Sequence, residues 1–342
     1  MLPTHRETLG AHLPDALSYP TFADRDAAWL LYQRMGGTQR IGDLGRGPLA
    51  PYMKRPAIRA VTARCGDGRL SPDDLLPLAD PLAAFEPDAP FAATAPAEAA
   101  CTAMMEADMR WFTVSFATWP QHQSSDWRDL QISRQGCNLV LQVNFPDAHQ
   151  QRFFRIFNQE ARHAIEYAGH PIRRDGPITM AWARLDFERD GEDVLIEELQ
   201  SDWLRVLRNG KGAVQGLVDK KSRALAKRYV EETLALYSDW ARVTLLAALA
   251  FSVAELGMRR IWLHQPGPGA RLKHIRDELP PRSLYTDLPR RFGFRPTDRA
   301  PAFLYDARHH VLGRLRRRGI PLFWRLDLED TAHRPTMMQN IA

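Results

Sequence analysis

Cysteines are few in this sequence, and their spacing argues against several kinds of site. The 342 residues include three of them, Cys65, Cys101 and Cys137, and no CxxC pair. An odd number of cysteines without paired spacing predicts neither a framework of disulfides nor a structural zinc site. We therefore expect reduced thiols and a cytoplasmic location.

Long hydrophobic runs are also missing. The longest apolar stretch, residues 243–256, contains Thr244, Ser252 and Glu255 and is shorter than the roughly 20 residues that span a bilayer. The N-terminal residues contain no hydrophobic segment of the signal-peptide type. These features predict a soluble protein that does not enter a membrane.

The short motifs of several large enzyme classes do not occur in the sequence. There is no Gly-x-Ser-x-Gly, P-loop, dinucleotide-binding fingerprint or HExxH. The motifs that usually indicate a hydrolase, an NTPase, a dehydrogenase or a zincin therefore do not support any of these functions here. Glu160, His163 and Glu166 share one helical face, but a carboxylate-bridged metal site needs a second motif of the same kind. Ion pairing along the helix explains their spacing, and we predict no metal site.

Arginine is the residue present in excess. The net charge is +5, and 40 of the 46 basic residues are arginine because only six are lysine. An excess of this size is weaker than the clustered charge of a dedicated nucleic-acid-binding protein, and a GC-rich genome explains it as well as a ligand does. Hydrophobic residues make up 44% of the chain, which indicates a packed globular protein.

The chain divides by composition into two regions. Residues 1–105 are rich in Gly, Pro and Ala, and we expect loops and short helices there, with one helix at 24–34 and another that starts at 71–74. The Pro- and Ala-rich stretch 85–100 is a candidate linker. Residues 106–342 form the second domain, in which strands and helices are clearly patterned.

The second region predicts an α/β fold with a mixed, largely antiparallel sheet. Strands are expected at 110–119, 138–145, 178–188, 194–199, 260–264 and 321–326, and helices at 148–168, 217–240, 241–255, 283–291 and 307–318. Asp190-Gly191 predicts a hairpin, and the Pro-Gly-Pro-Gly sequence at 266–269 predicts a turn. The sheet is therefore antiparallel early, with a strand–helix–strand crossover in the middle.

One segment concentrates polar groups at the end of a buried strand. The apolar run 194–196 is followed by acids, an amide and a hydroxyl, namely Glu197, Glu198, Gln200, Ser201 and Asp202. Such groups are costly to bury unless they are paired or used, so the segment is either a site or a set of ion pairs with arginines. We expect Gln200, Asp202 and Trp203 to fix the strand exit and contact substrate, with Asp202 capping the next element.

The order of elements around this segment resembles a known superfamily. A hairpin, a helix and a strand precede a short helix with Leu284-Tyr285, followed by Gly293-Phe294. This order is similar to the acetyl-CoA-dependent N-acetyltransferase (GNAT) superfamily, over residues 178–305 at most. The resemblance implies transfer of an acyl group from acetyl-CoA or another acyl-CoA to an amine, with Tyr285 reprotonating the thiolate. The alternative is a tyrosine that belongs to the core.

The same resemblance implies a loop that binds the pyrophosphate of the acyl-CoA. The nearest match is residues 207–212, where Gly210, Lys211 and Gly212 would bind the phosphates. Leu207 stands where the family has Gln or Arg, and the loop lies some distance beyond the strand end. Ordinary turn glycines are the alternative interpretation.

A general base is the other requirement of this chemistry. Glu197 or Glu198 would serve if its pKa were raised, and because they point to opposite faces of a strand, only one can line a given cleft. His264, at the end of a later strand, would relay protons or else cap that strand.

A second resemblance leaves a non-enzymatic function open. Glu197–Trp203, Leu256-Gly257 and Ile261-Trp262 are similar to a module of obscure function in large phage-encoded polyvalent proteins. The alternative function is therefore that of an accessory protein of mobile-element or phage type. Its face for nucleic acid or a protein partner would be the basic helix end that contains Arg314, Arg316, Arg317 and Arg318.

Overall fold

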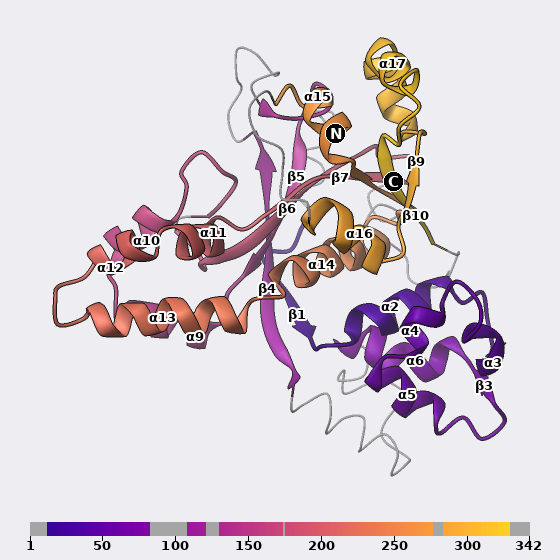
Figure 1. Cartoon of the computed structure of the whole chain (residues 1–342), viewed down its shortest axis with the longest axis horizontal. Coiled ribbons are helices and arrows are strands. Elements are labelled where there is room, and N and C mark those ends of the chain that lie inside the picture. Colours follow the sequence, from indigo (N-terminus) through magenta and orange to yellow (C-terminus); the bar gives the residue numbers. More distant parts are fainter. Residues whose placement is uncertain (1–11, 83–107, 121–129, 174, 276–282, 329–342) are drawn as a thin grey trace. The chain divides into compact units, whose positions relative to one another are not determined.

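The computed structural model describes residues 12–82, 108–120, 130–173, 175–275 and 283–328 (Figure 1). The chain divides into a smaller unit, built mainly from residues 19–111, and a larger unit, built mainly from residues 112–326. The linker predicted at 85–100 and the domain boundary predicted after residue 105 lie outside the described residues.

The smaller unit consists of short helices and a two-stranded ribbon. Its elements are α2 (Arg25–Arg34), β2 (Gln39–Arg40), α3 (Ile41–Leu44), α4 (Ala50–Met53), α5 (Pro56–Thr62), β3 (Arg69–Leu70) and α6 (Pro72–Ala79). The helix predicted at 24–34 is confirmed as α2. The start signal at 71–74 is confirmed as well, because Ser71 and Asp74 form a capping box at α6.

The chain forms one eight-stranded mixed sheet. In order across the sheet, its strands are β1 (Leu17–Thr21), β4 (Arg110–Trp119), β5 (Asn138–Asn144), β6 (Thr179–Phe187), β7 (Asp193–Gln200), β8 (Arg260–His264), β10 (Phe323–Asp327) and β9 (Arg295–Thr297). The pairs β4–β5, β5–β6, β6–β7 and β9–β10 are antiparallel, and β7–β8 is the parallel pair among the described strands. The predicted mixed, largely antiparallel α/β sheet is confirmed. Two of its strands have no predicted counterpart, namely the short β9 and β1, which lies in the region where only loops and short helices were expected.

Helices pack against the sheet in the larger unit. They are α9 (Asp147–Phe154), α10 (Gln159–Ile165), α11 (Asp202–Asn209), α12 (Lys211–Gly216), α13 (Arg223–Leu236), α14 (Trp240–Ala254), α15 (Pro266–Leu272), the π-helix η2 (Ser283–Asp287), α16 (Leu288–Arg291) and α17 (Ala302–Arg316). α14 packs on β5, β6 and β7. A separate core cluster joins α15 and α17 to Leu195, Trp262 and Phe323 of β7, β8 and β10.

Two predicted elements are wrong for identifiable reasons. The single helix predicted at 148–168 is two helices, because Asn158 starts α10 as its N-cap and accepts a hydrogen bond from the N–H of Ala161 (2.9 Å). The turn predicted at 266–269 is the start of α15. Its proline occupies the first helical position, where the missing N–H costs nothing.

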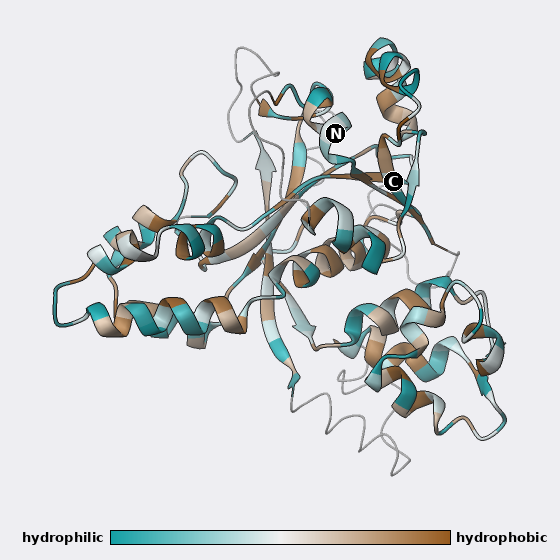
Figure 2. Cartoon of the chain, viewed as in Figure 1, coloured by the Kyte–Doolittle hydropathy of each residue, from teal (hydrophilic) through white to brown (hydrophobic). Residues whose placement is uncertain are grey.

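The crossover from β7 to β8 runs through α11–α14. Hydrophilic and hydrophobic residues alternate along α13 (Figure 2), and its buried residues are Ala226, Tyr229, Val230 and Thr233. Gly257, at φ +69°, follows α14 in the left-handed conformation that glycine adopts readily. In the described part of the chain no single helix is long and apolar enough to span a membrane. The helices α13 and α14 reach that length and apolar composition only when taken together, and they are bent by 50° relative to each other.

Candidate functional site

The strands β7 and β8 are paired over only half of β7. Parallel pairing runs from Asp193 opposite Arg260 to Ile196 opposite Leu263. β8 ends one residue later, whereas β7 continues to Gln200. Ligands of sheets with parallel strands commonly bind in the crevice beyond the carboxyl ends of those strands, so this point of separation is where a site is expected.

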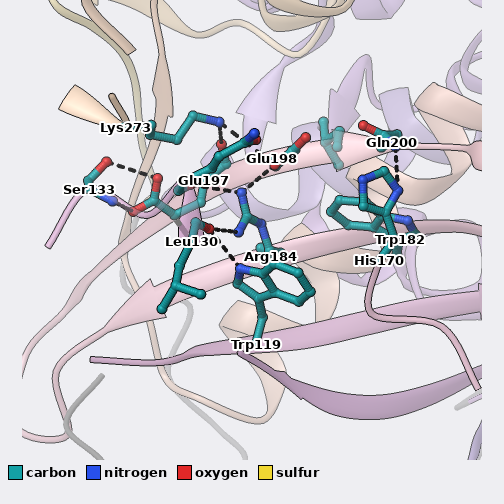
Figure 3. A network of polar contacts seen from close by, with 12 residues as sticks. Trp119, Leu130, Ser133, His170, Trp182, Arg184, Glu197, Glu198, Gln200 and Lys273 are labelled. Atoms are coloured by element: carbon teal, nitrogen blue, oxygen red, sulfur yellow. Dashed lines mark hydrogen bonds and ion pairs between the residues drawn. The ribbon is translucent and has the colours of Figure 1, made fainter. Parts of the chain in front are cut away.

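A β-bulge lies where the two strands separate. On the other side of β7, Glu198 pairs with Arg184 and Ile196 pairs with Leu185, so Glu197 is the extra residue between them. Bulges bend a strand, re-aim its side chains and are frequent next to active sites. The two adjacent carboxylates have different hydrogen-bond partners within one network of polar contacts (Figure 3).

A cavity of ≈ 620 Å³ lies beside this part of β7. The polar side chains in its wall include Gln131, His170, Glu198, Gln200, Arg205, Arg208, His264, Lys273 and Tyr285. Four of the residues predicted from the sequence, Glu198, Gln200, His264 and Tyr285, are therefore brought together in one cavity, although they come from β7, β8 and η2.

Glu197 does not line the cavity and is fully buried. Its Oε1 accepts the N–H of Ser133 (2.9 Å), and its Oε2 accepts the Ser133 hydroxyl (2.9 Å) and Nε2–H of His264 (2.8 Å). Burial alone would raise the pKa of Glu197, but the hydrogen bond and charge of His264, followed by Lys273 and Arg184, outweigh burial and lower this pKa to about 2. Glu197 therefore remains a carboxylate that positions Ser133 and His264.

His264 lines the cavity with little exposed surface. Burial lowers the pKa of His264, and the neighbouring Glu197 offsets this only in part. Ser133 Oγ lies 3.0 Å from the same Nε2 that binds Glu197, while Nδ1 has no hydrogen-bond partner among the described residues. In a hydrolase triad the serine and the acid bind opposite nitrogens of the imidazole. The cluster is therefore not a nucleophilic triad.

Glu198 lies in the cavity wall beside two cations. Its carboxylate forms an ion pair with Arg184 and lies 3.8 Å from Nζ of Lys273, which also donates to the carbonyl oxygen of Glu197 (3.1 Å; Figure 3). Burial would raise the pKa of Glu198, but Arg184 and Lys273 outweigh it and lower this pKa. The raised pKa expected of a general base is thus found at neither Glu197 nor Glu198.

Tyr285 lines the cavity from η2. Its Oη accepts the backbone N–H of Leu199 (3.3 Å), which leaves the phenolic hydrogen available for another acceptor. Burial, followed by the charge of Glu198, raises the pKa of Tyr285. The hydroxyl therefore keeps its proton at neutral pH. The Tyr285 carbonyl accepts Nε1–H of Trp324 (2.8 Å), which ties η2 to β10.

The segment after Leu199 differs from the prediction in two respects. Ser201, not Asp202, is the N-cap of α11, because its hydroxyl accepts a backbone N–H of the first turn (3.1 Å). Trp203 is 1% exposed and packs in an aromatic core, so it does not contact a ligand in the cavity. Asp202 is buried, and only Gln200 of the three predicted substrate-binding residues lines the cavity.

The predicted pyrophosphate loop forms the junction of α11 and α12. Gly210 and Gly212 are not among the described residues that line the cavity, and the side chain of Lys211 lies outside what the structure describes. The N–H of Gly210 donates back to α11 (2.7 Å) and is not available to a phosphate. Two exposed arginines of the preceding helix, Arg205 and Arg208, do line the cavity.

The residues of this site that sequence reasoning missed include Ser133, His170, Arg184 and Lys273, and also Gln131, Arg205 and Arg208 of the cavity wall. Each of the first four is an isolated residue whose partners lie on distant elements, so no local spacing marks it. Arg184 is the one of these residues that a local signal could have found. An arginine in the middle of the apolar run 179–187 needs a polar partner when it is buried.

The four arginines predicted as a binding face, Arg314, Arg316, Arg317 and Arg318, are all exposed at the end of α17. Arg316 lies 3.5 Å from Asp298. No protein-family model, curated protein or solved structure matches this chain. The function is therefore inferred from the chemistry of the cavity.

Proposed function

We propose that the protein is an acyl-CoA-dependent N-acyltransferase-like enzyme that acts on an amine, and that its sheet is of the GNAT-like kind. The observation that carries the proposal is the position of Tyr285. Its Oη accepts the Leu199 N–H at the place where β7 has separated from β8, in the wall of the ≈ 620 Å³ cavity. A tyrosine that retains its proton beside an unpaired strand edge is suited to protonate a departing thiolate.

Glu198 is the proposed contact for the amine. A carboxylate has about four acceptor positions, and Arg184 and Lys273 occupy only part of them. The remaining positions accept an amine N–H and orient the nitrogen toward the acyl carbon, which is the positioning effect that accelerates such transfers. Because the pKa of Glu198 is lowered, we assign it orientation of the amine rather than removal of its proton.

An acyl-CoA bound in the cavity supplies the acyl group as an activated thioester. Arg208 would hold its phosphates together with the nitrogens of Arg205 other than Nη2, which donates to Asp202 (2.9 Å), since guanidinium groups bind phosphate through two parallel hydrogen bonds. Backbone N–H groups at the start of α11 fit this role poorly, because Ser201 caps them and the Asp202 carboxylate stands in the first turn. The cavity therefore fits the donor with arginines in place of the predicted glycine loop.

Tyr285 donates one proton and accepts another during the acyl transfer. As the bond from nitrogen to the acyl carbon forms and the carbon–sulfur bond breaks, Tyr285 donates its hydroxyl proton to the sulfur. It then takes the surplus proton of the new amide nitrogen. The amine must first lose one proton from its ammonium form, and the lowered pKa values of Glu197 and Glu198 make both poor acceptors for it.

The proposal is tested by thermal melting with acetyl-CoA, longer acyl-CoA esters and free coenzyme A. A ligand that binds the native state at a hundred times its Kd stabilises the protein by about 2.7 kcal/mol, so we expect a higher Tm. Arg205→Gln with Arg208→Gln should remove the increase, whereas Arg314→Gln with Arg316→Gln, two exposed arginines that do not line the cavity, should retain it. An unchanged Tm with every thioester would refute the proposed function.

Turnover is measured as thiol release with a panel of amines. Tyr285→Phe removes the proton donor while it retains the buried ring, and we expect kcat to fall by about 10²-fold or more. Melting with the thioester should be unaffected by this change, so that loss of chemistry is separated from loss of binding.

The second candidate function is binding of nucleic acid by an accessory protein. The exposure of all four arginines at the end of α17 favours it. A labelled single-stranded DNA or RNA should then bind with an affinity that falls steeply with salt. Replacement of Arg314, Arg316, Arg317 and Arg318 by glutamine should flatten that dependence, and absence of binding at low salt would exclude this function.

A further inference from the structure

His170 lines the same cavity as Glu198 and Tyr285, although no sequence pattern marks it. It lies between α10 and β6, and its side chain is 23% exposed. His264, the other histidine of the cavity wall, is only 2% exposed at its side chain. His170 is therefore the more accessible imidazole.

Asp202 determines how the His170 ring is protonated. Nδ1 of His170 lies 2.8 Å from both carboxylate oxygens of Asp202, and 2.9 Å from Nε2 of Gln200, an amide nitrogen that itself donates to Oδ1 of Asp202 (2.6 Å). An ionised carboxylate only accepts hydrogen bonds, so Nδ1 carries the hydrogen and Nε2 presents its lone pair. This is the arrangement by which an aspartate fixes the tautomer of a catalytic histidine.

The environment of Asp202 keeps it ionised. Burial would raise the pKa of Asp202, but the hydrogen bond and charge of His170, and then hydrogen bonds from Trp182 and Gln200, outweigh it and lower this pKa. Trp182 Nε1–H donates to Oδ2 (3.1 Å), and Arg205 donates to Oδ1 (2.9 Å). The carboxylate that orients His170 is thus itself fixed in position.

The plane of the His170 ring is also constrained. Tyr167 packs edge-on against it with ring centroids 4.6 Å apart, and Trp182 does so at 5.4 Å. Nε2 has no hydrogen-bond partner among the described residues. The ring therefore presents one unoccupied lone pair at a cavity wall to which the proposed amine contact, Glu198, also belongs.

We infer that His170, oriented by Asp202, is the general base that takes the proton from the ammonium form of the amine substrate. The inference rests on the proposed function. Nε2 accepts one ammonium proton and the ring becomes an imidazolium. The neutral nitrogen then forms its bond to the acyl carbon while the carbon–sulfur bond breaks, Tyr285 exchanges protons as described above, and His170 releases its proton to solvent.

The other basic groups of the cavity are less suitable. Nε2 of His264 is held by Glu197 and Ser133, and its Nδ1 is buried. Lys273 is occupied by the Glu197 carbonyl and the Glu198 carboxylate. His170 combines solvent exposure, a fixed tautomer and a vacant nitrogen.

Charged groups on two elements surround this base. Asp202 of α11 contacts the ring directly, Arg205 contacts Asp202, and Glu198 of β7 interacts with His170 through its charge. Trp182 and Gln200, its neighbours from β6 and β7, carry no charge. A general base acts only in its unprotonated form, so the rate of a base-catalysed reaction falls on the acidic side of its pH profile.

The test compares His170→Gln with His163→Gln, an exposed histidine of α10. For His170→Gln we expect kcat/KM for thiol release to fall at least 10²-fold, the acidic limb to disappear, and the thioester-induced rise in Tm to remain. For His163→Gln all three should match the unaltered protein. If His170→Gln retains both the rate and the acidic limb, the inference is wrong and the proposed function stands.

A second measurement does not depend on acyl transfer. Diethyl pyrocarbonate acylates an unprotonated imidazole nitrogen, and mass spectrometry locates the adduct. We expect His170 to react before His264, and Asp202→Asn to slow the reaction at His170. If the unaltered protein releases no thiol, the proposed function fails, whereas a reactive His170 still shows that its imidazole presents an accessible, unprotonated nitrogen. A His170 that does not react while His163 does would overturn the inference itself.

Discussion

Replacement of His149 by glutamine tests how burial controls the pH dependence of stability. The His149 ring is 6% exposed, stacks on Phe145 with centroids 3.9 Å apart, and has Nε2 2.9 Å from the hydroxyl of Tyr229. Tyr229 accepts Nε1–H of Trp203 and so has its own hydrogen to donate to the neutral imidazole. Burial, and then the charge of Arg152, lower the pKa of His149 to about 3.

The sign of the effect follows from proton uptake by the two states. The unfolded chain binds a proton at His149 below its ordinary pKa of 6.5, whereas the folded protein excludes it until about pH 3. Between these values the unfolded state binds more protons, so the free energy of unfolding rises with pH. The contribution is fully present above pH 6.5 and is lost as pH falls toward 3. At 1.36 kcal/mol per unit, a shift of about 3.5 units corresponds to at most about 5 kcal/mol.

The assay is urea denaturation followed by tryptophan fluorescence between pH 4 and 8. At pH 7 we expect His149→Gln to be less stable by roughly 1–3 kcal/mol, because the packing of the ring is lost. Below pH 6.5 the difference should shrink by about 1.4 kcal/mol per unit and reverse near pH 5. Titratable groups that both proteins contain affect the two free energies of unfolding equally, so their contributions cancel in the difference. Two parallel curves would show that His149 is protonated in the folded state and would refute the reasoning.

Three further substitutions test the site and its support. Gly269→Ala places a methyl group 2.6 Å from Cβ of His264 and should lower the Tm. Gly267→Ala, on the same helix, meets no atom within 4 Å and should leave the Tm equal or higher. Equal Tm values for the two variants would contradict this packing. Glu197→Gln removes a carboxylate with three hydrogen bonds, and urea denaturation should show a loss of about 1.5–3 kcal/mol; an unchanged midpoint would mean that the buried charge contributes nothing. Trp203→Ala should cost about 3–5 kcal/mol by the same assay without abolishing thioester binding in the residual folded protein, and loss of binding at full stability would return Trp203 to the site.

Much of the sheet was predictable because its signals are local. The strands predicted at 110–119 and 260–264 have the observed bounds of β4 and β8, since runs of aromatic and β-branched residues specify an extended chain without reference to the rest of the fold. The prediction was wrong where one side chain decides the backbone. Asn158 divides a continuous apolar stripe into two helices, and the sequence pattern at 148–168 gives little weight to a single cap.

The site was predictable as a location but not as an electrostatic environment. The polar segment at the end of β7 correctly directs attention to Glu198, Gln200 and the cavity they line. The direction of the pKa shift at Glu198 depends on Arg184 and Lys273, which reach it from β6 and from the residue after α15. Contacts between residues so far apart in sequence carry no periodicity. The sequence alone therefore offered ion pairing with arginine only as an alternative, which the Arg184–Glu198 pair confirms for Glu198, and could not identify which cations outweigh the burial.

The parallel pairing of β7 with β8 has a consequence for the order in which the chain folds. Asp193 and Arg260 are 67 residues apart in sequence. Closing such a loop costs conformational entropy before the pairing of the strands contributes any stabilisation. The antiparallel strands β5, β6 and β7 have much shorter connections and are expected to assemble first. The cavity has no wall from β8 until this long loop has closed, so we expect ligand binding to appear only in the last folding phase, after most of the secondary structure has formed.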